Sequence, residues 1–270
     1  MRLVIRHRTD YRYSKPLAYA IQTLRLTPRT YDGLAVISWQ VRGERQRELP
    51  SYIDGLGNVV HSNSLNRPHD RAAIAVEGVV ETRATGGGVR DARECLPPTY
   101  FLRRTRLTGP DESIARLAAE AARGTNGMDR LVALREAVAA RVVYRQGVTD
   151  AKTSASQALA TGSGVCQDHA HLFIACCRTL GIPARYVGGY LWTGHGGEEQ
   201  ASHAWAEAWL DEQGWIGFDP SNNAQPGESY IRIAIGLDYW QAAPVRGIRR
   251  GEAEETLAVK VAITVADSIQ

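Results

Sequence analysis

Hydrophobic and polar residues alternate with a period of two over the first third of the chain. The apolar runs are short, are rich in valine, isoleucine and leucine, and are separated by turns that contain proline, glycine or asparagine. No stretch of helical periodicity interrupts them, which is typical of an antiparallel β-sandwich. Three glycines at residues 86–88 predict a joint, so we assign residues 1–88 to an N-terminal β-sandwich domain. The four clearest runs are residues 3–7, 23–27, 36–41 and 73–80.

Beyond residue 88 the apolar residues recur at helical spacing before the two-residue period returns. One helix is predicted to start near residue 111, a second covers residues 129–143, and a third covers residues 166–180. Strands follow at residues 184–192, 203–210 and 215–219. Helices followed by an antiparallel sheet predict an α+β domain over residues 89–270.

Cys166 stands where a small, flexible segment meets the start of the third helix. A helix start presents unpaired backbone N–H groups and the positive end of the helix dipole. A cysteine there has its thiolate form favoured, and the same N–H groups can stabilise the oxyanion that forms when sulfur attacks a carbonyl. The residues alone leave two interpretations open: a nucleophilic cysteine, or a buried structural one, since free cysteines are among the most buried residue types.

A thiolate nucleophile needs a base, and the base needs a third group that orients its ring. His203 opens one predicted strand and Asp219 ends its hairpin partner, so the two side chains can meet if they share a face of the sheet. A four-residue loop that pairs Leu210 with Trp215 would put them on opposite faces. We therefore predict an odd-length turn or a bulge near Gly214, where glycine can adopt a left-handed conformation.

Composition excludes several functions. The net charge of +3 over 270 residues is small and the basic residues are scattered, so no nucleic-acid partner is predicted. No run approaches the ~18 apolar residues of a membrane span, and the N-terminus lacks the apolar core of a secretory signal. The four cysteines do not form a disulfide pattern, which favours reduced thiols and a cytoplasmic location.

The polar residues that follow Cys166 do not predict a metal site. His169 and His171 lie two positions apart on the predicted helix and cannot share a face, so a zinc pair is not expected. Asp168 lies in the first helical turn, where a carboxylate satisfies backbone N–H groups, and we interpret it as structural. Neither a metal nor another cofactor is expected.

Four motifs around these residues resemble the signature of the bacterial transglutaminase-like family, which belongs to the papain-like cysteine protease superfamily. They are residues 164–171, 181–187, 202–207 and 214–220. Similarity to the family extends to its N-terminal β domain at residues 11–13, 24–29 and 54–58, and to its C-terminal motif at residues 233–239 and 244–247. The resemblance implies a papain-like core with Cys166 as nucleophile, His203 as general base and acid, and Asp219 as the residue that orients His203. Leu237 and Gln241 depart from the family pattern, which usually has arginine and aspartate there.

The expected reaction is acyl transfer from a carboxamide or peptide bond through a thioester on Cys166. Water as the acceptor would make the protein a protease or deamidase, which we prefer, and an amine would make it a transglutaminase. The expected partner is a peptide or protein substrate, with an amine acceptor as an option. Gln167, Trp192 and Tyr239 are the further residues expected near the oxyanion or the substrate. The alternative is a catalytically silent binding or scaffold module that has kept the fold.

Overall fold

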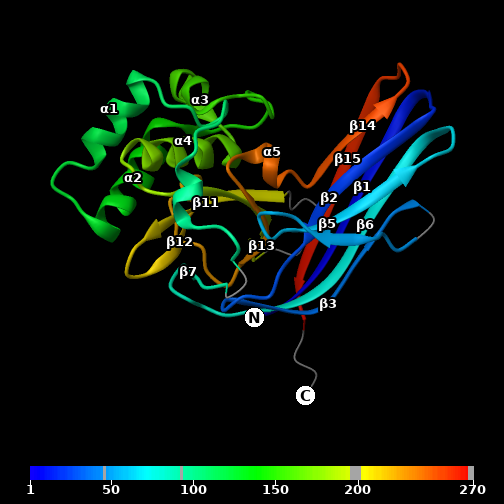
Figure 1. Ribbon diagram of the computed structural model, residues 1–270, viewed down its shortest axis with the longest axis horizontal. Coiled ribbons are helices and arrows are strands. Elements are labelled where there is room, and N and C mark those ends of the chain that lie inside the picture. The colour runs from blue at the N-terminus through cyan, green and yellow to red at the C-terminus, as the bar shows by residue number, and fades with distance from the viewer. Residues whose placement is uncertain (45–46, 92–93, 195–201, 267–270) are drawn as a thin grey trace.

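The computed structural model describes residues 1–44, 47–91, 94–194 and 202–266. Figure 1 shows a layer of helices at the left, a five-stranded sheet in the centre and a β-sandwich at the right. Neighbouring strands of the sandwich and of the five-stranded sheet are antiparallel. The predicted α+β architecture, a sandwich followed by helices packed on an antiparallel sheet, is confirmed.

The sandwich consists of two four-stranded sheets that share an apolar core. The first has the order β15-β1-β6-β3, with β15 at Glu255–Val265, β1 at Arg2–Leu17, β6 at His69–Thr82 and β3 at Leu34–Arg42. The second has the order β14-β2-β5-β4, with β14 at Val245–Arg250, β2 at Tyr19–Thr27, β5 at Val59–Leu65 and β4 at Ser51–Ile53. Buried and exposed side chains alternate along much of β1 and β6, as a period of two predicts.

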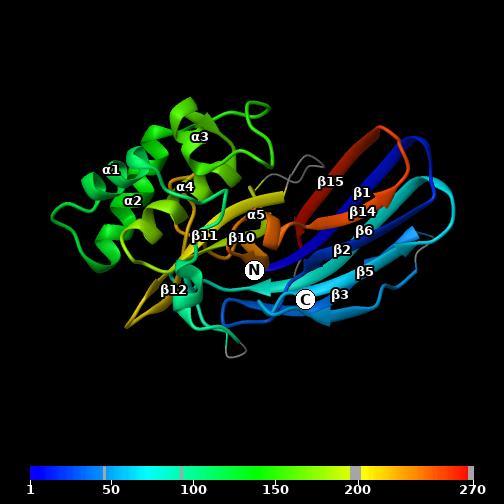
Figure 2. The ribbon, with the colours of Figure 1, turned by 45° about the horizontal axis from the view of Figure 1, so that its top comes forward.

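The last two strands of the chain return to the sandwich. β14 pairs with β2 from Val245 opposite Leu24, and β15 pairs with β1 from Val265 opposite Leu3. Figure 2 shows the orange and red C-terminal strands beside the blue N-terminal ones. The structure therefore differs from the expected division, which placed everything from residue 89 to residue 270 in the second domain. The sequence does not predict that the two ends of the chain pair, because the hydrophobic period indicates where a strand lies but not which strand it pairs with.

The five-stranded sheet and its helices surround a central helix, α4. Every residue of α4 from Asp168 to Arg178 is buried, and the helix packs on β10 and β11. The sheet has the order β13-β10-β11-β12-β7, at Tyr230–Gly236, Ala184–Leu191, Ser202–Leu210, Gly214–Phe218 and Gly88–Val89. The helices are α1 at Glu112–Ala121, α2 at Gly127–Arg141, α3 at Ala155–Thr161, α4 at Cys166–Thr179 and α5 at Tyr239–Ala242. The smaller elements are a 3-10 helix at Pro98–Leu102 and two short parallel strands, β8 at Val143–Tyr144 and β9 at Ser163–Gly164.

Polar contacts join the sandwich to the five-stranded sheet. The amide of Asn58 donates to the carbonyl of Ile235 at 2.9 Å and accepts from the N–H of Ile235 at 2.8 Å. On β1, the Nδ1 atom of His7 lies 2.7 Å from the hydroxyl of Tyr190 on β10. These bonds therefore join the N-terminal domain to β13 and β10, and β10 pairs with the strand that carries His203.

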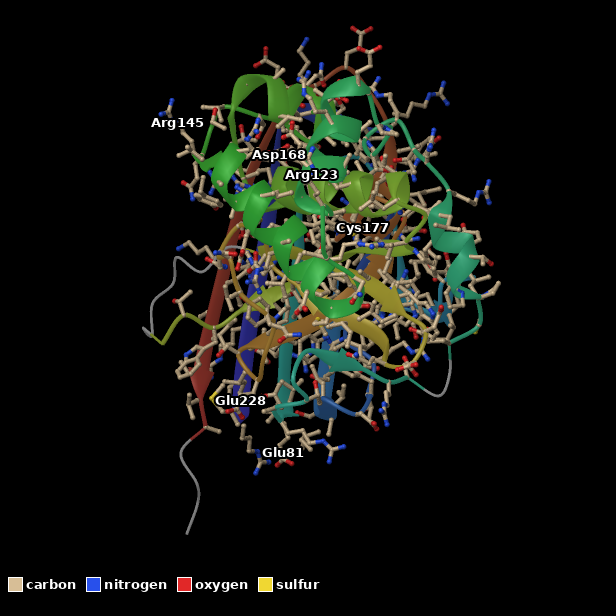
Figure 3. All side chains as sticks on the ribbon, turned by 90° about the vertical axis from the view of Figure 1, so that its left-hand side faces the viewer. Glu81, Arg123, Arg145, Asp168, Cys177 and Glu228 are labelled. Atoms are coloured by element: carbon tan, nitrogen blue, oxygen red, sulfur yellow. The ribbon has the colours of Figure 1, made fainter. Side chains whose placement is uncertain are left out.

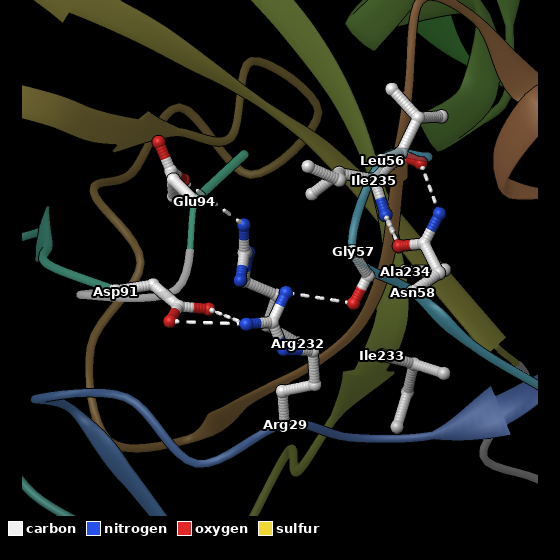
Figure 4. A pocket seen from close by; sticks show the side chains of 10 residues that line it. All are labelled: Arg29, Leu56, Gly57, Asn58, Asp91, Glu94, Arg232, Ile233, Ala234 and Ile235. Atoms are coloured by element: carbon white, nitrogen blue, oxygen red, sulfur yellow. Dashed lines mark hydrogen bonds and ion pairs between the residues drawn. The ribbon is translucent and has the colours of Figure 1, made fainter. Parts of the chain in front are cut away.

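A small cavity lies where the two parts meet (Figure 4). Arg29 donates to the carbonyl of Gly57 at 2.7 Å and pairs with Asp91 at 3.3 Å, and Arg232 lies beside them. The cavity has a volume of about 10 Å³, which is about the space that one water molecule needs. It is too small to be a substrate site.

Candidate active site

Cys166 is the first residue of α4, and its side chain is partly exposed. The carboxylate of Asp168 accepts hydrogen bonds from the N–H of Val165 at 2.8 Å and from the hydroxyl of Thr149 at 2.6 Å. Asp168 also fills the space beside Gly164, where an added Cβ atom would lie 2.7 Å from the Cβ of Asp168. Figure 3 shows Asp168 on the helical side of the molecule, where these bonds fix the turn that leads into α4. Asp168 thus has structural contacts, in line with the sequence-based interpretation.

The hairpin between β11 and β12 brings His203 and Asp219 to the same end of the sheet. Leu210 pairs with Gly214, so the loop contains three residues, and Gly214 has a φ of +82°. The same register continued to Asp219 sets it opposite Trp205, on the face of His203. The predicted odd-length turn at Gly214 is confirmed, and it is the feature that allows the imidazole and the carboxylate to meet.

His203 is the link between Cys166 and Asp219. Its Nε2 atom lies 2.7 Å from Oδ2 of Asp219. The other ring nitrogen, Nδ1, is therefore the one that can interact with the sulfur of Cys166. Burial lowers the pKa of His203, but hydrogen bonds to Asp219 and Cys166 outweigh burial and raise the pKa to about 9. Burial raises the pKa of Asp219, but hydrogen bonds from His203, Ser221 and Asn222 reverse this and hold the pKa well below its ordinary value. At neutral pH the pair is an imidazolium and a carboxylate.

Asp219 is fully buried and accepts hydrogen bonds on both oxygens. Ser221 donates to Oδ1 from its N–H at 3.0 Å and from its hydroxyl at 2.7 Å. Asn222 and Tyr230 donate to Oδ2 at 2.7 Å and 2.9 Å. The sequence did not single out these three residues. A serine and an asparagine just after Asp219 and Pro220 are typical turn residues that could have been noticed, whereas Tyr230 carries no local signal.

An open groove of about 360 Å³ is lined in part by Asn222 and Tyr230, the two residues that donate to Oδ2 of Asp219. Trp192, which we expected near the substrate, lies in its wall. Gln167 and Tyr239 do not line the groove: Gln167 is the half-buried second residue of α4, and Tyr239 packs edge-on against another tyrosine. The described residues that line the groove are Leu191, Trp192, Thr193, Gly194, Asn222, Ser229 and Tyr230.

Both histidines within α4 have structural partners. The Nδ1 and Nε2 atoms of His169 lie 2.9 Å and 2.8 Å from the carbonyl oxygens of Val165 and Val142. Nε2 of His171 accepts from the N–H of Tyr239 at 3.1 Å, and burial lowers the pKa of His171 to about 3, so this ring is neutral. Within the described residues no group of three or more histidine, cysteine or acidic side chains is arranged to hold a metal ion. None of the helices in that part of the chain has the length and apolar character needed to cross a membrane.

Leu237 and Gln241, which depart from the family pattern, contact each other. The N–H of Leu237 donates to Oε1 of Gln241 at 2.8 Å, and its carbonyl accepts from the buried Arg178 at 2.8 Å. The side chain of Leu237 packs in an apolar cluster with Phe101 and Trp205. The two residues therefore join the end of β13 to α5 through an uncharged hydrogen bond. Arginine and aspartate at these positions would both carry a charge.

We expect the stability of the fold to depend on pH through His203. Its folded-state pKa of about 9 lies above the ordinary value of 6.5, so its stabilising contribution is complete below pH 6.5 and is lost as the pH rises from 6.5 to 9. The wild-type protein should lose at most a few kcal/mol over this range, since one pKa unit corresponds to about 1.4 kcal/mol. His203→Gln should flatten this part of the profile, and His69→Gln on the sandwich should not. Urea unfolding at several pH values measures both, and equal slopes in wild type and His203→Gln would contradict the expectation.

The comparisons with known proteins cover both parts of the chain. Residues 97–220 match the transglutaminase-like superfamily, and residues 3–81 match the bacterial transglutaminase-like N-terminal region. An uncharacterized protein of Mycobacterium leprae is 32% identical over 282 residues, which cover 97% of this chain and 98% of that protein. A protein-glutamine gamma-glutamyltransferase of Pseudomonas aeruginosa is 38% identical over 89 residues, which cover 29% of this chain and 12% of that protein.

The fold also has a match among solved structures. The crystal structure of a candidate cysteine protease from Cytophaga hutchinsonii has a TM-score of 0.77 and 23% identity, and the match covers 99% of this chain and 92% of that one. At this identity the match supports the fold, and the family assignment depends on the sequence matches. The chain therefore belongs to the transglutaminase-like superfamily and carries the N-terminal region found in its bacterial members.

Proposed function

We propose that the protein is a cysteine-dependent enzyme that transfers the acyl group of a carboxamide or peptide bond through a thioester. The observation that carries the proposal is the placement of His203 between Asp219, at 2.7 Å, and Cys166 at the start of α4. The superfamily match supports it, because residues 97–220 include all three side chains. A scaffold protein would have no physical need for a buried carboxylate that orients an imidazole beside a cysteine.

The proposed first step forms the acyl-enzyme. The Cys166 thiolate, stabilised by the His203 imidazolium, attacks the carbonyl carbon and forms a C–S bond. The N–H groups of Cys166 and Gln167 have no acceptor within the helix, so they are available to stabilise the oxyanion. When the tetrahedral species collapses, the C–N bond breaks, His203 gives its proton to the leaving amine, and the thioester remains.

The second step returns the enzyme to its starting state. A water or amine molecule attacks the thioester carbonyl and gives a proton to His203, the C–S bond breaks, and the sulfur leaves as a thiolate. The groove that Asn222 and Tyr230 line is open, so water can approach the surroundings of Asp219, and we propose hydrolysis as the main reaction. The described lining of this groove contains no charged side chain, which favours an uncharged segment of a peptide or protein substrate.

Alkylation of the cysteines tests whether Cys166 is activated. We expect iodoacetamide to modify Cys166 at pH 6 at least about tenfold faster than the exposed Cys95, because the start of α4 and the neighbouring imidazolium of His203 stabilise negative charge on its sulfur. Cys176 and Cys177 are buried and should stay unmodified, and burial raises the pKa of Cys176 to about 12. Peptide mapping by mass spectrometry gives the four rates. Equal, slow labelling of Cys166 and Cys95 would favour the scaffold alternative instead.

A further inference from the structure

Tyr230 connects the groove to the carboxylate of Asp219. Its hydroxyl donates to Oδ2 of Asp219 at 2.9 Å, the same oxygen that lies 2.7 Å from Nε2 of His203. The side-chain amide of Asn222 donates to that oxygen as well, at 2.7 Å. A carboxylate oxygen that accepts three hydrogen bonds has its charge divided among three donors. The pull of Asp219 on the proton of His203 is therefore weaker than in an isolated pair.

The ring of Tyr230 lies against the catalytic histidine and in the wall of the groove. Its centroid is 5.9 Å from that of His203, and it meets the ring of Trp205 edge-on at 5.3 Å. The same ring lines the open groove together with Trp192. Tyr230 is the first residue of β13 and pairs with Leu191 of β10, so its backbone is fixed by the sheet. One side chain thus borders the proposed substrate path and reaches the triad.

The titratable side chains that face His203 within the described residues come from three parts of the fold. They are Cys166 from α4, Asp219 from the end of the β11–β12 hairpin, and Tyr230 from β13. Burial raises the pKa of Tyr230, and the charge of Asp219 adds to this effect, so the hydroxyl keeps its proton and acts as a donor. An uncharged donor on Asp219 weakens the electrostatic attraction between its carboxylate and the imidazolium of His203, and it adds no charge to the site.

We propose that Tyr230 is a positioning residue that sets, through Asp219, how strongly His203 holds its proton. The inference rests on the proposed function, because it assigns a role within the same site. The substitution that tests this is Tyr230→Phe, which keeps the ring and removes only the hydroxyl.

Removal of the hydroxyl should make Asp219 a stronger partner for the imidazolium. The titration of His203 should therefore move to higher pH by about half a unit, a part of the roughly one-unit effect of a direct hydrogen bond. The measurement is an NMR titration of the His203 ring, whose signal is assigned by its absence in His203→Gln. Tyr190→Phe is the matched control, since the hydroxyl of Tyr190 is buried and bonds to His7 of the sandwich rather than to Asp219.

A second substitution keeps the test valid if Tyr230→Phe folds poorly. Asn222 is exposed, so Asn222→Ala should leave the fold intact while it removes another donor from Oδ2, and it should move the His203 titration in the same direction. An unchanged titration in both variants would overturn the proposal, whatever happens to activity. The NMR readout needs no substrate. A shifted titration in a protein that never forms an acyl-enzyme would therefore refute the proposed function and leave the role of Tyr230 in place.

Discussion

Cys166→Ala is expected to abolish acyl transfer and leave the fold intact. The change removes the atom proposed to form the thioester, and in cysteine and serine enzymes loss of the nucleophile lowers kcat by several orders of magnitude, about 10³-fold or more. The stability should change by less than about 1 kcal/mol, because Cys166 is partly exposed at the first position of α4 and alanine is a strong helix former. The variant therefore separates chemistry from folding.

The measurement for Cys166→Ala is intact-protein mass spectrometry with glutamine-containing peptides. The wild-type protein should gain the mass of the acyl group, hydroxylamine should remove it, and the variant should never gain it. Addition of a primary amine shows whether the product is the acid or the transamidated peptide. Cys95→Ala, a change at an exposed cysteine, is the matched control and should retain full turnover. Full activity in Cys166→Ala would end the proposed mechanism.

The register of the hairpin that carries His203 and Asp219 could be predicted from the sequence, because the proposed chemistry constrains it. A hydrogen bond between His203 and Asp219 requires both side chains on one face of the sheet, and this requirement is enough to predict the register of the hairpin. The pairing of Leu210 with Gly214 and the φ of +82° at Gly214 meet that requirement. A functional hypothesis thus predicted a backbone detail that propensity alone could not.

The parts that could not be predicted depend on contacts between distant segments. Strand β15 pairs with β1 at the opposite end of the chain, and a strand pattern does not name its partner. Tyr230 lies on β13, which pairs with β10, and its hydroxyl reaches Asp219 at the end of β12; the sequence does not encode this order of strands locally. Gln167 and Tyr239 do not line the groove that contains Trp192, and their expected place near the oxyanion or the substrate stays a prediction.

The largest effect on stability is expected from Glu207, which is fully buried on β11 on the same strand face as His203. Oε2 of Glu207 lies 2.6 Å from Nε of Arg185, and Oε1 lies 3.0 Å from Nε of Arg232. The second contact is an ion pair without hydrogen-bond alignment. Both guanidinium groups are buried, and Glu94 is the other carboxylate that they share, at 2.6 Å and 3.9 Å.

Glu207→Met should lower the free energy of unfolding by about 3–5 kcal/mol, because it leaves buried cations with too little opposite charge. Burial lowers the pKa of Arg185 even with Glu207 present, which indicates how costly its desolvation is. The surface pair of Arg8 and Asp10 is the matched control: its side chains are 54% and 38% exposed, so Asp10→Asn should cost less than about 1 kcal/mol. Urea unfolding measures both variants.

A double variant distinguishes an unpaired charge from a simple loss of packing. If the cost of Glu207→Met comes from a stranded guanidinium, then Arg185→Met added to it removes one stranded cation and should restore part of the stability. If the cost comes from lost packing, the second change should add its own penalty, because Arg185 also lies 3.9 Å over the ring of Trp215. A double variant less stable than Glu207→Met alone would therefore show that these buried side chains stabilise the fold through packing and not through charge balance.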